Sequence, residues 1–390
     1  MSDGIFTAET GLRAFESGLQ AISNDSSNLN TPGYKGSTVL FADLVGGDGG
    51  EMLGGGGEGV TTTGTAVDFS AGQLQSTGNP LDLAISGNGF FTLEASNGAI
   101  HYTQDGQFEF NSSGTLVSSA TGEKVMALDS SGSLVPITIT GSQTNPAQAT
   151  KTVTFTGNLQ STATTDTVGS ITVIDSAGDT HSLSLALTPV SATPGSWTAT
   201  LTDGATTVGT GTIEFANGEP VPGSDTLAFT YTPAGGTAMP LTLDFSNGVT
   251  SNSAGTSSTL AFSSQDGFPV GTLSDQALTF NSAGILQLTY SNGQTVNGAQ
   301  LALANFASPE DVTAISSNEF AAKSGQSLQV GVAGSGSFGT IQAQEIEASN
   351  VDLSQEFSEL VIMQRGYQAC SQVISTASDM LSSLFNMVVK

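Results

Sequence analysis

The residues of this 390-residue chain that could do acid–base, nucleophilic or metal chemistry are few. His101 and His181 are the only histidines, and no group of Cys, His and acidic residues has the sequence spacing of metal ligands. A serine triad would need one of these histidines as its base, and the chain has no Gly-x-Ser-x-Gly turn to present the nucleophile. The 34 acidic residues would supply the paired carboxylates of a glycosidase, but none stands in an aromatic-rich stretch. We therefore expect no catalytic residue, no metal site and no enzyme.

One glycine-rich stretch matches a cofactor motif without its context. Gly334 to Gly339 has the glycine spacing of the dinucleotide fingerprint, which requires a β-α-β unit around it. Here one long helical pattern follows, without a second parallel strand. We interpret the stretch as a turn that joins a sheet to that helix. No Gly-Lys pair occurs, so a phosphate-binding P-loop is excluded, and we expect no cofactor.

The charge of the chain restricts its partners. Seven Lys and Arg face 34 Asp and Glu, which gives a formal charge of −27 and argues against nucleic acid and anionic membranes. No run of about 18 apolar residues occurs, so we expect no lipid insertion. The first residues lack the pattern of a cleavable signal peptide, and composition alone favours a cytoplasmic protein. The single cysteine, Cys370, allows no internal disulfide and is expected to be a small buried residue.

The last segment of the chain has the clearest helical periodicity. From Leu360 onward apolar residues recur at alternating three- and four-residue steps, which predicts one apolar seam along a helix that requires a partner helix. Asp352, followed by Gln355, predicts the N-cap. The seam comprises Leu360, Met363, Tyr367, Cys370, Ile374, Ala377, Leu381, Leu384 and Val388.

The first segment repeats this spacing and is the expected partner. Its seam comprises Ile5, Ala8, Leu12, Phe15, Leu19, Ile22, Ser26 and Leu29. Thr31-Pro32-Gly33 then ends the helix, because proline restricts the residue before it and cannot continue the hydrogen-bond ladder. The ordinary interpretation is a two-helix cap on a globular core. We prefer assembly between molecules, because neither helix alone offers its partner a wide apolar face.

Between the helices the pattern is that of β-strands. Residues 36–72 are glycine-rich and predict a linker, flexible above all over 46–59. From about Gln73 apolar and polar residues alternate, with Gly, Asn, Asp and Pro at the turns. The segment 146–265 is rich in Thr, Ser and Ala and predicts an insertion. We expect a mixed, mainly β fold: a coiled-coil pair of terminal helices (1–35 and 346–390), an inner antiparallel β domain (73–145 and 266–345), and an outer one (146–265) nested within it.

Five blocks in order along the chain resemble the flagellar rod and hook axial protein family of bacteria. The first, directly after the N-terminal helix, contains Asn28, Asn30, Thr31, Gly33 and Tyr34. The next two are Leu81 to Phe91, which contains Gly89, Phe90 and Phe91, and Tyr102 to Phe108. The last two are Glu347 to Leu353, which contains Ser349, Asn350, Val351 and Asp352, and Gln364 to Gln368, which contains Gln364 and Arg365.

Other stretches are similar to the hook members of this family. They are Ile174 to His181, Gly267 to Gly271, Tyr290 to Gln294 and Ala302 to Phe306. Distal rod members are shorter and lack a segment like 146–265. Gly366 and Cys370 depart from the family pattern.

The resemblance implies a structural subunit of the flagellar hook that polymerises with itself into a curved tube. Such a tube would act as a universal joint that links rod to filament and transmits motor torque. The implied partners are the rod and hook–filament junction proteins, the hook cap during assembly, and the type III export apparatus, which implies an extracellular location. The residues expected to carry assembly are Ile5, Leu12, Phe15, Leu19, Ile22, Leu29, Leu360, Tyr367, Ile374, Leu381 and Val388.

Two other functions stay open at this point. One is a different axial protein, such as a distal rod or hook-capping subunit, against which the length of the chain and its middle blocks argue. The other is a secreted β-rich adhesin or carbohydrate-binding module with helical ends. Glycan binding by a monomer would distinguish that module from a hook subunit.

Overall fold

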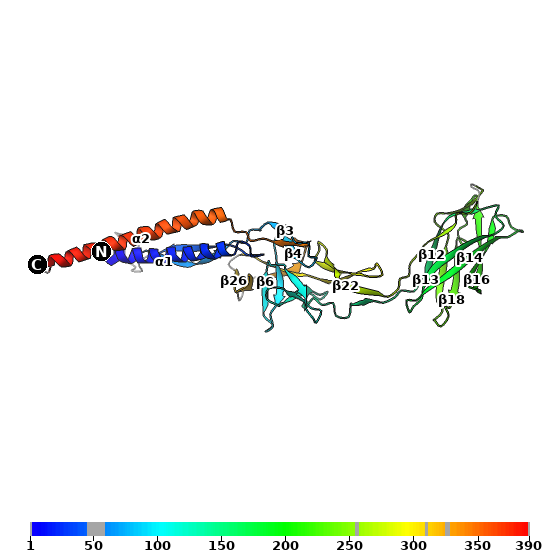
Figure 1. The fold of residues 1–390 in the computed structure, drawn as a ribbon, viewed down its shortest axis with the longest axis horizontal. Coiled ribbons are helices and arrows are strands. Elements are labelled where there is room, and N and C mark those ends of the chain that lie inside the picture. Colours follow the sequence, from blue (N-terminus) through cyan, green and yellow to red (C-terminus); the bar gives the residue numbers. More distant parts are fainter. Residues whose placement is uncertain (1, 45–58, 254–256, 309–310, 324–327, 389–390) are drawn as a thin grey trace. The chain divides into compact units, whose positions relative to one another are not determined.

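The computed structural model describes residues 2–44, 59–253, 257–308, 311–323 and 328–388 (Figure 1). Helices α1 (Ser2–Ser27) and α2 (Leu353–Val388) lie at the two ends of the chain, and strands joined by turns lie between them. The mixed, mainly β fold with helical ends is confirmed. The chain folds as two compact units. The helix-bearing unit comprises Met1–Thr140, Leu278–Leu288 and Asn297–Lys390, and the all-β unit comprises Gly141–Ala277 and Thr289–Val296.

In the helix-bearing unit, α1 and α2 lie side by side and antiparallel (Figure 1). As α1 advances from Gly11 to Gly18, its contacts on α2 move back from Cys370 to Met363. Asp352 caps α2 as predicted, since its Oδ1 accepts a hydrogen bond from the backbone N–H of Ser354 at 2.8 Å.

The N-terminal helix ends earlier than its apolar pattern predicts. The hydroxyl of Ser27 and the side-chain amide of Asn28 donate to the carbonyls of Ser23 and Asn24, so side chains add hydrogen bonds to the carbonyls of the last turn. The chain turns there, before Thr31. Leu29 therefore lies outside the helix, and its prediction as a member of the helical seam is wrong.

The segment 36–72, predicted to be a linker, contains a pair of antiparallel strands. Strand β1 (Ser37–Asp43) pairs with β2 (Val60–Val67), and their register joins Ser37 to Val67 and Asp43 to Val60. Both strands contact α1, where the hydroxyl of Thr10 accepts the backbone N–H of Val60. The linker prediction is wrong for these strands. It rested on the glycine content of the whole segment and gave too little weight to the β-branched residues of the two strands. Residues 45–58, which include most of the flexible segment predicted over 46–59, lie outside the described residues.

The main sheet of the helix-bearing unit has the order β26-β27-β6-β5-β9-β8-β7, to which β10, β25 and β28 are joined. Its core contains Phe91 and Phe108, whose rings meet edge to face with centroids 5.0 Å apart. The strands are β5 (Phe90–Glu94), β6 (Ile100–Thr103), β7 (Phe108–Phe110), β8 (Leu116–Ser118), β9 (Lys124–Leu128), β10 (Leu134–Pro136), β25 (Ala302–Phe306), β26 (Val312–Ala314), β27 (Glu319–Ala322) and β28 (Leu328–Val332).

Two short antiparallel pairs join the outgoing and returning parts of the chain. They are β3 (Leu74–Ser76) with β30 (Glu345–Glu347), and β4 (Leu83–Ser86) with β29 (Thr340–Ala343). The glycine-rich stretch Gly334 to Gly339 is a turn as expected, but it joins β28 to β29 and not a sheet to a helix. Both pairs bring the residues before α2 next to the residues that follow the β1–β2 pair.

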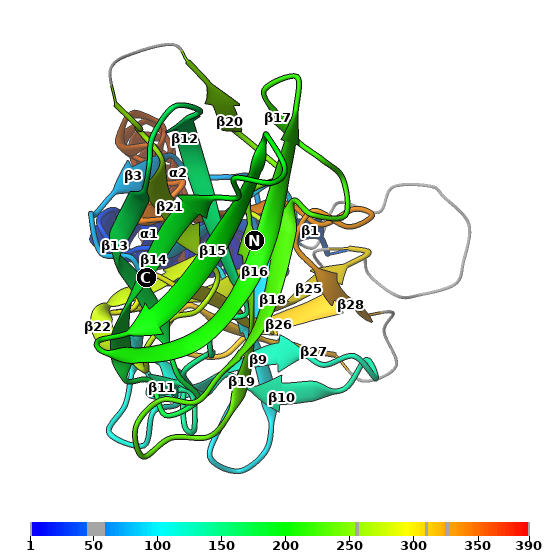
Figure 2. The ribbon, with the colours of Figure 1, turned by 90° about the vertical axis from the view of Figure 1, so that its right-hand side faces the viewer.

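The all-β unit has one apolar core between two sheets. Their orders are β18-β19-β12-β20, with β21 on β12, and β13-β14-β15-β16-β17 (Figure 2). Against the antiparallel expectation, β12 pairs parallel with β19 and β20. The strands are β12 (Thr152–Gln160), β13 (Asp166–Ile174), β14 (Thr180–Pro189), β15 (Ser196–Asp203), β16 (Thr206–Ala216), β17 (Glu219–Pro220), β18 (Thr226–Tyr231), β19 (Met239–Asp244), β20 (Val249–Asn252) and β21 (Ala261–Gln265).

A further sheet has the order β11-β22-β23-β24. Its strands are β11 (Thr144–Asn145), β22 (Gly271–Phe280), β23 (Ile285–Tyr290) and β24 (Thr295–Gln300), and the division between the two units passes through the last three. The domain bounds expected from the sequence, 73–145 with 266–345 and 146–265, stay a prediction.

Candidate assembly site: the helix pair and its clasp

A buried ion pair joins the segment after α1 to the segment before α2. Lys35 Nζ lies 2.7 Å from Glu347 Oε1, and both side chains are almost fully buried. Lys35 also donates to the carbonyl of Ser70, and Glu347 Oε1 accepts the backbone N–H of Gly72. A buried charge is stable only when it is paired and hydrogen-bonded, so this geometry holds three distant segments together.

A second buried acid fixes the end of α1. Asp25 is 2% exposed; its Oδ1 accepts the Tyr34 hydroxyl at 2.7 Å and its Oδ2 accepts the backbone N–H of Ser37 at 2.8 Å. Burial, together with the hydrogen bond to Asp25, raises the pKa of Tyr34. The phenol therefore stays neutral and keeps donating to the carboxylate. Burial and the Asp25 charge also raise the pKa of Glu356, in the first turn of α2.

Asn350 completes this set of contacts. Its Oδ1 accepts the backbone N–H of Gly36 at 2.8 Å, and its Nδ2 donates to the carbonyls of Asp68 and Ser70. A side-chain amide that uses both ends in this way fixes the spacing of the two segments it bridges. We call Asp25, Tyr34, Lys35, Glu347 and Asn350 the clasp.

The turn after α1 is wedged against the β part of the same unit. Gly33 has φ 66°, and a Cβ at this position would lie 2.5 Å from the backbone nitrogen of Asp105. Any side chain there would collide with the backbone, so only glycine fits. Asn318 holds the turn from another side, because its Nδ2 donates to the carbonyl of Pro32 at 3.1 Å.

The other family-motif residues have simpler surroundings. Thr31 donates to Asn28 Oδ1, and Gly89 accepts a hydrogen bond from Gln104. Phe90 and Phe91 are buried, Ser349 accepts the backbone N–H of Val351, and Asp352 caps α2. Asn30, Gln364 and Arg365 are exposed. The sequence motif therefore marks the clasp, although it did not show which of its residues pair.

The contact between the two helices rests on small residues. Ideal Cβ atoms at Gly11 and Gly18 would lie 2.9 Å and 3.0 Å from the sulfur atoms of Cys370 and Met363, respectively. A Cβ at Gly366 would overlap the ring of Phe15. Side chains of each helix thus lie against glycines of the other. The apolar periodicity did not find Gly11 and Gly18, because glycine carries no apolar side chain to count.

The predicted seams are only partly placed at this contact. In α1, Ile22 is buried, whereas Ile5, Leu12, Phe15 and Leu19 are half-buried. In α2, Leu360, Ile374 and Leu381 are half-buried. Tyr367 and Leu384 are 41% and 46% exposed, so α1 of the same chain does not cover them, and Gly366 contacts α1 in place of Tyr367. Their place in a seam between molecules stays a prediction. The side chain of Val388 is not among those that the structure describes.

The C-terminal helix leaves many large apolar side chains uncovered. Ile362, Phe385 and Met387 are 63%, 68% and 73% exposed. Phe357, Val361, Val373 and Met380 are also exposed, each by roughly half. A helix that is apolar on several sides is normally covered on several sides.

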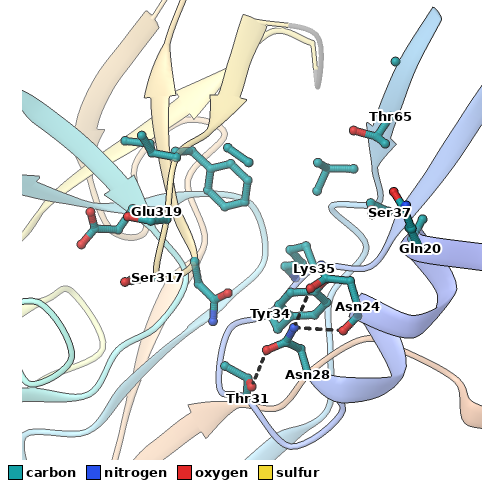
Figure 3. Close-up of a pocket in the computed structure, with 18 of the residues that line it drawn as sticks. Gln20, Asn24, Asn28, Thr31, Tyr34, Lys35, Ser37, Thr65, Ser317 and Glu319 are labelled. Carbon is teal, nitrogen blue, oxygen red and sulfur yellow. Dashed lines mark hydrogen bonds between the residues drawn. The ribbon is translucent and has the colours of Figure 1, made fainter. Parts of the chain in front are cut away.

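A cleft of about 870 Å³ lies beside the clasp (Figure 3). α1, β2 and the segment before β27 line it. Asn24, Asn28 and Tyr34 lie together at its edge, linked by hydrogen bonds (Figure 3). These groups hold their neighbours by hydrogen bonds.

Sequence spacing predicted no metal ligands, yet the fold brings three candidate ligands together. His101, Glu123 and Glu319 place one ligand atom each within 4.8 Å of one another. Sequence spacing did not show this cluster, because sheet pairing joins residues that are far apart in the sequence; the expectation of no metal site stays a prediction. In the part of the chain that the structure describes, neither helix combines the length and the apolarity needed to cross a membrane.

Comparison with known proteins gives one consistent family. Residues 84–172 match the model of the flagellar hook protein FlgE/F/G D1 domain, and residues 342–387 match that of the flagellar basal body rod FlgEFG protein C-terminal. The chain is 33% identical to flagellar hook protein FlgE of Escherichia coli (strain K12), over 97% of this chain and 98% of that protein. It is 27% identical to flagellar hook protein FlgE of Treponema pallidum (strain Nichols), over 99% and 100%.

A solved structure supports the fold alone. The crystal structure of Helicobacter pylori flagellar hook protein FlgE2 aligns with a TM-score of 0.51 at 13% identity. It covers 70% of this chain and all of that one.

Proposed function

Since the chain belongs to the flagellar hook protein FlgE family and is a structural subunit of the bacterial flagellar hook, we propose that its terminal helices polymerise it. We further propose that the clasp carries load from these helices into the β-rich part of the subunit. The full-length match to hook proteins does not favour a rod, capping or adhesin role.

The observation that carries the proposal is the uncovered apolar surface of α2. α1 covers one side of α2, while Ile362, Phe385 and Met387 remain more than 60% exposed. At about 25 cal/mol per Å² of apolar surface buried, covering such a helix with its neighbours would stabilise each contact by several kcal/mol. Helices of further copies of this chain are the natural cover in a homopolymer.

The clasp supports the second part of the proposal. Torque applied to the helix pair must pass through the segments after α1 and before α2, which Lys35 and Glu347 join. Asn350 ties the same two segments by a hydrogen bond from Gly36, and Asp25 ties the segment after α1 to α1 itself. A polymer built this way would act as a curved universal joint between rod and filament, stiff against twist along the helix layer.

Further partners follow from the hook role. They are the rod and hook–filament junction proteins at the two ends of the polymer, the hook cap during growth, and the type III export apparatus that would deliver the chain to an extracellular site. Only 11% of the residues of the chain are charged, which would let the β parts of neighbouring copies slide without breaking many strong ion pairs.

The proposal is tested by adding one negative charge to the uncovered surface of α2. Ile362→Asp should leave the monomer folded, because Ile362 is exposed, and should abolish tubes under salting-out conditions, because the charge would be buried between copies. Ser371→Asp is the matched control, since Ser371 is an exposed polar residue of the same helix. Electron microscopy and sedimentation measure the polymer. Tubes formed by Ile362→Asp as readily as by the unchanged chain would overturn the proposal.

A further inference from the structure

Three side chains converge on one face of the main sheet. His101 Nδ1 lies 2.9 Å and 3.0 Å from the two carboxylate oxygens of Glu123 and 3.1 Å from Glu319 Oε2. His101 and Glu123 are partly buried, and the side chain of Glu319 is 6% exposed. The cluster lies within the helix-bearing unit and outside the clasp and the helix contact.

Strand register explains why these three residues meet. Thr103 of β6 pairs with Glu319 of β27, and His101 lies two residues before Thr103 on the same face. On the other side of β6, Leu93 of β5 pairs with both His101 and Val125 of β9. Glu123 precedes Val125 by two residues, which again gives the same face. The sheet therefore fixes the cluster from β6, from β27 and from the residue that precedes β9.

The cluster has more hydrogen-bond acceptors and more negative charge than its donors and cations balance. One Nδ1–H can be directed well at one acceptor, yet three oxygens of two carboxylates surround that nitrogen. Glu319 Oε1 is buried and has no hydrogen-bond partner among the described residues. Within the same residues, no Lys or Arg forms an ion pair with Glu123 or Glu319. The cluster thus carries more negative charge than its partners neutralise.

We propose that His101, Glu123 and Glu319 bind a divalent transition-metal ion, with Zn²⁺ as the best match. One imidazole nitrogen and two carboxylates form a donor set that Zn²⁺ uses, whereas Mg²⁺ and Ca²⁺ prefer oxygen ligands alone. The nitrogen–oxygen separations of 2.9 Å to 3.1 Å are close to the roughly 3.3 Å edge of a tetrahedron with 2.0 Å bonds. The free oxygen of Glu319 would gain a partner, and water would complete the coordination.

The position of the site predicts what the ion does. Asn318, next to Glu319, donates to the carbonyl of Pro32 in the turn after α1, and its own carbonyl accepts the hydroxyl of Thr103. In Figure 3, Glu319 lies on the wall of the cleft with its carboxylate directed away from Tyr34. A bound ion would cross-link β6, β27 and the loop before β9, and would stabilise the wall against which the turn rests. This role does not depend on the proposed assembly surface of α2.

The test is Zn²⁺ titration of the metal-free, untagged full-length chain by isothermal calorimetry, at a concentration where it stays monomeric. The expected result is one equivalent bound, with no comparable binding of Mg²⁺ or Ca²⁺. His101→Gln and Glu319→Gln should each weaken binding by more than about tenfold, the loss that follows even from changing an outer-shell partner. His181→Gln is the matched control, because His181 contacts a single carboxylate, Asp175, at 3.1 Å and should change nothing.

Thermal unfolding gives a second readout that separates binding from misfolding. Zn²⁺ should raise the unfolding temperature of the unchanged chain and of His181→Gln, but not of His101→Gln. If Glu319→Gln fails to fold because its side chain is buried, Glu123→Gln replaces it, since Glu123 precedes β9 and is less buried. Absence of saturable Zn²⁺ binding, or binding that is undiminished in His101→Gln and in the glutamate variant, would overturn the proposal.

Discussion

The all-β unit and the terminal helices differ in how completely each covers its own apolar surface. In the all-β unit, Trp197 and Leu201 are 2% and 0% exposed within a core built by both sheets. In α2, Phe385 and Met387 are 68% and 73% exposed, although they are equally apolar. The first region closes on itself, as an independent domain does. The second is complete only when other chains cover it, which is what a polymer subunit requires.

The clasp differs from both the all-β core and the terminal helices, because its buried groups are polar and charged. Replacing Lys35 by Met should give the largest loss of stability, about 3–5 kcal/mol, because Glu347 would keep its charge in a buried site without its cation. Denaturant unfolding of the helix-bearing unit measures this loss. Lys124→Met is the matched control: its pair with Glu94 is partly exposed, so we expect a change of about 1 kcal/mol or less. Equal losses for the two variants would contradict the role of the clasp.

A cavity in the all-β core should separate folding from assembly. Leu201→Ala removes a fully buried side chain and should lower the unfolding free energy of the all-β unit by about 3 kcal/mol. Tubes should still form below the new unfolding temperature, since the assembly surface on α2 is unchanged. Loss of tubes in a folded Leu201→Ala chain would show that the all-β unit also carries assembly, and would remove the contrast between the two regions.

Asp105, whose backbone lies against Gly33 beside the clasp, should make the unfolding free energy depend moderately on pH. Burial raises the pKa of Asp105 to about 6, from 3.8 for the free side chain. Between these values the folded chain binds a proton that the unfolded chain has released, so the unfolding free energy decreases as the pH rises from about 4 to about 6. Asp105→Asn keeps an oxygen to accept the Gln107 N–H and should remove this decrease. We expect it to stabilise the chain at pH 7 by on the order of 1–2 kcal/mol. An unchanged pH profile in the variant would contradict this assignment.

The smallest expected effect lies on the outer surface of α1. Arg13 contacts Glu9 at 2.7 Å, but the two side chains are 77% and 50% exposed. Arg13→Gln should therefore change the unfolding free energy by less than about 0.5 kcal/mol. A larger loss of stability, or loss of tubes, would place Arg13 at a contact between copies and widen the assembly surface beyond α2.

Much of the fold could be predicted from local sequence signals. The alternation of apolar residues predicted the strands around Leu183 and Trp197, and Asp352 predicted the start of α2. Strand β16 lacks such a signal. Its Gly209 and Gly211 leave space for the side chains of Phe229 and Leu227 on β18. Without knowledge of that contact, the glycines of this strand predict a loop.

The sites depend on pairs that are distant in the sequence, which limits what one sequence predicts. The family motif located the turn around Tyr34, yet nothing in the sequence pairs Lys35 with Glu347. Likewise, His101 and Glu319 meet only because β27 pairs with β6. Periodicity also counts large apolar residues, so it found Phe15 and missed the glycine of α2 that receives it.

The central claim is that the terminal helices, and not the β regions, polymerise the chain. Electron microscopy of the purified full-length chain under salting-out conditions, beside a chain that lacks residues 1–35 and 350–390, tests it most directly. We predict curved tubes from the full-length chain only. Tubes from the shortened chain, or a full-length chain that stays monomeric under every condition that polymerises related hook proteins, would contradict the account.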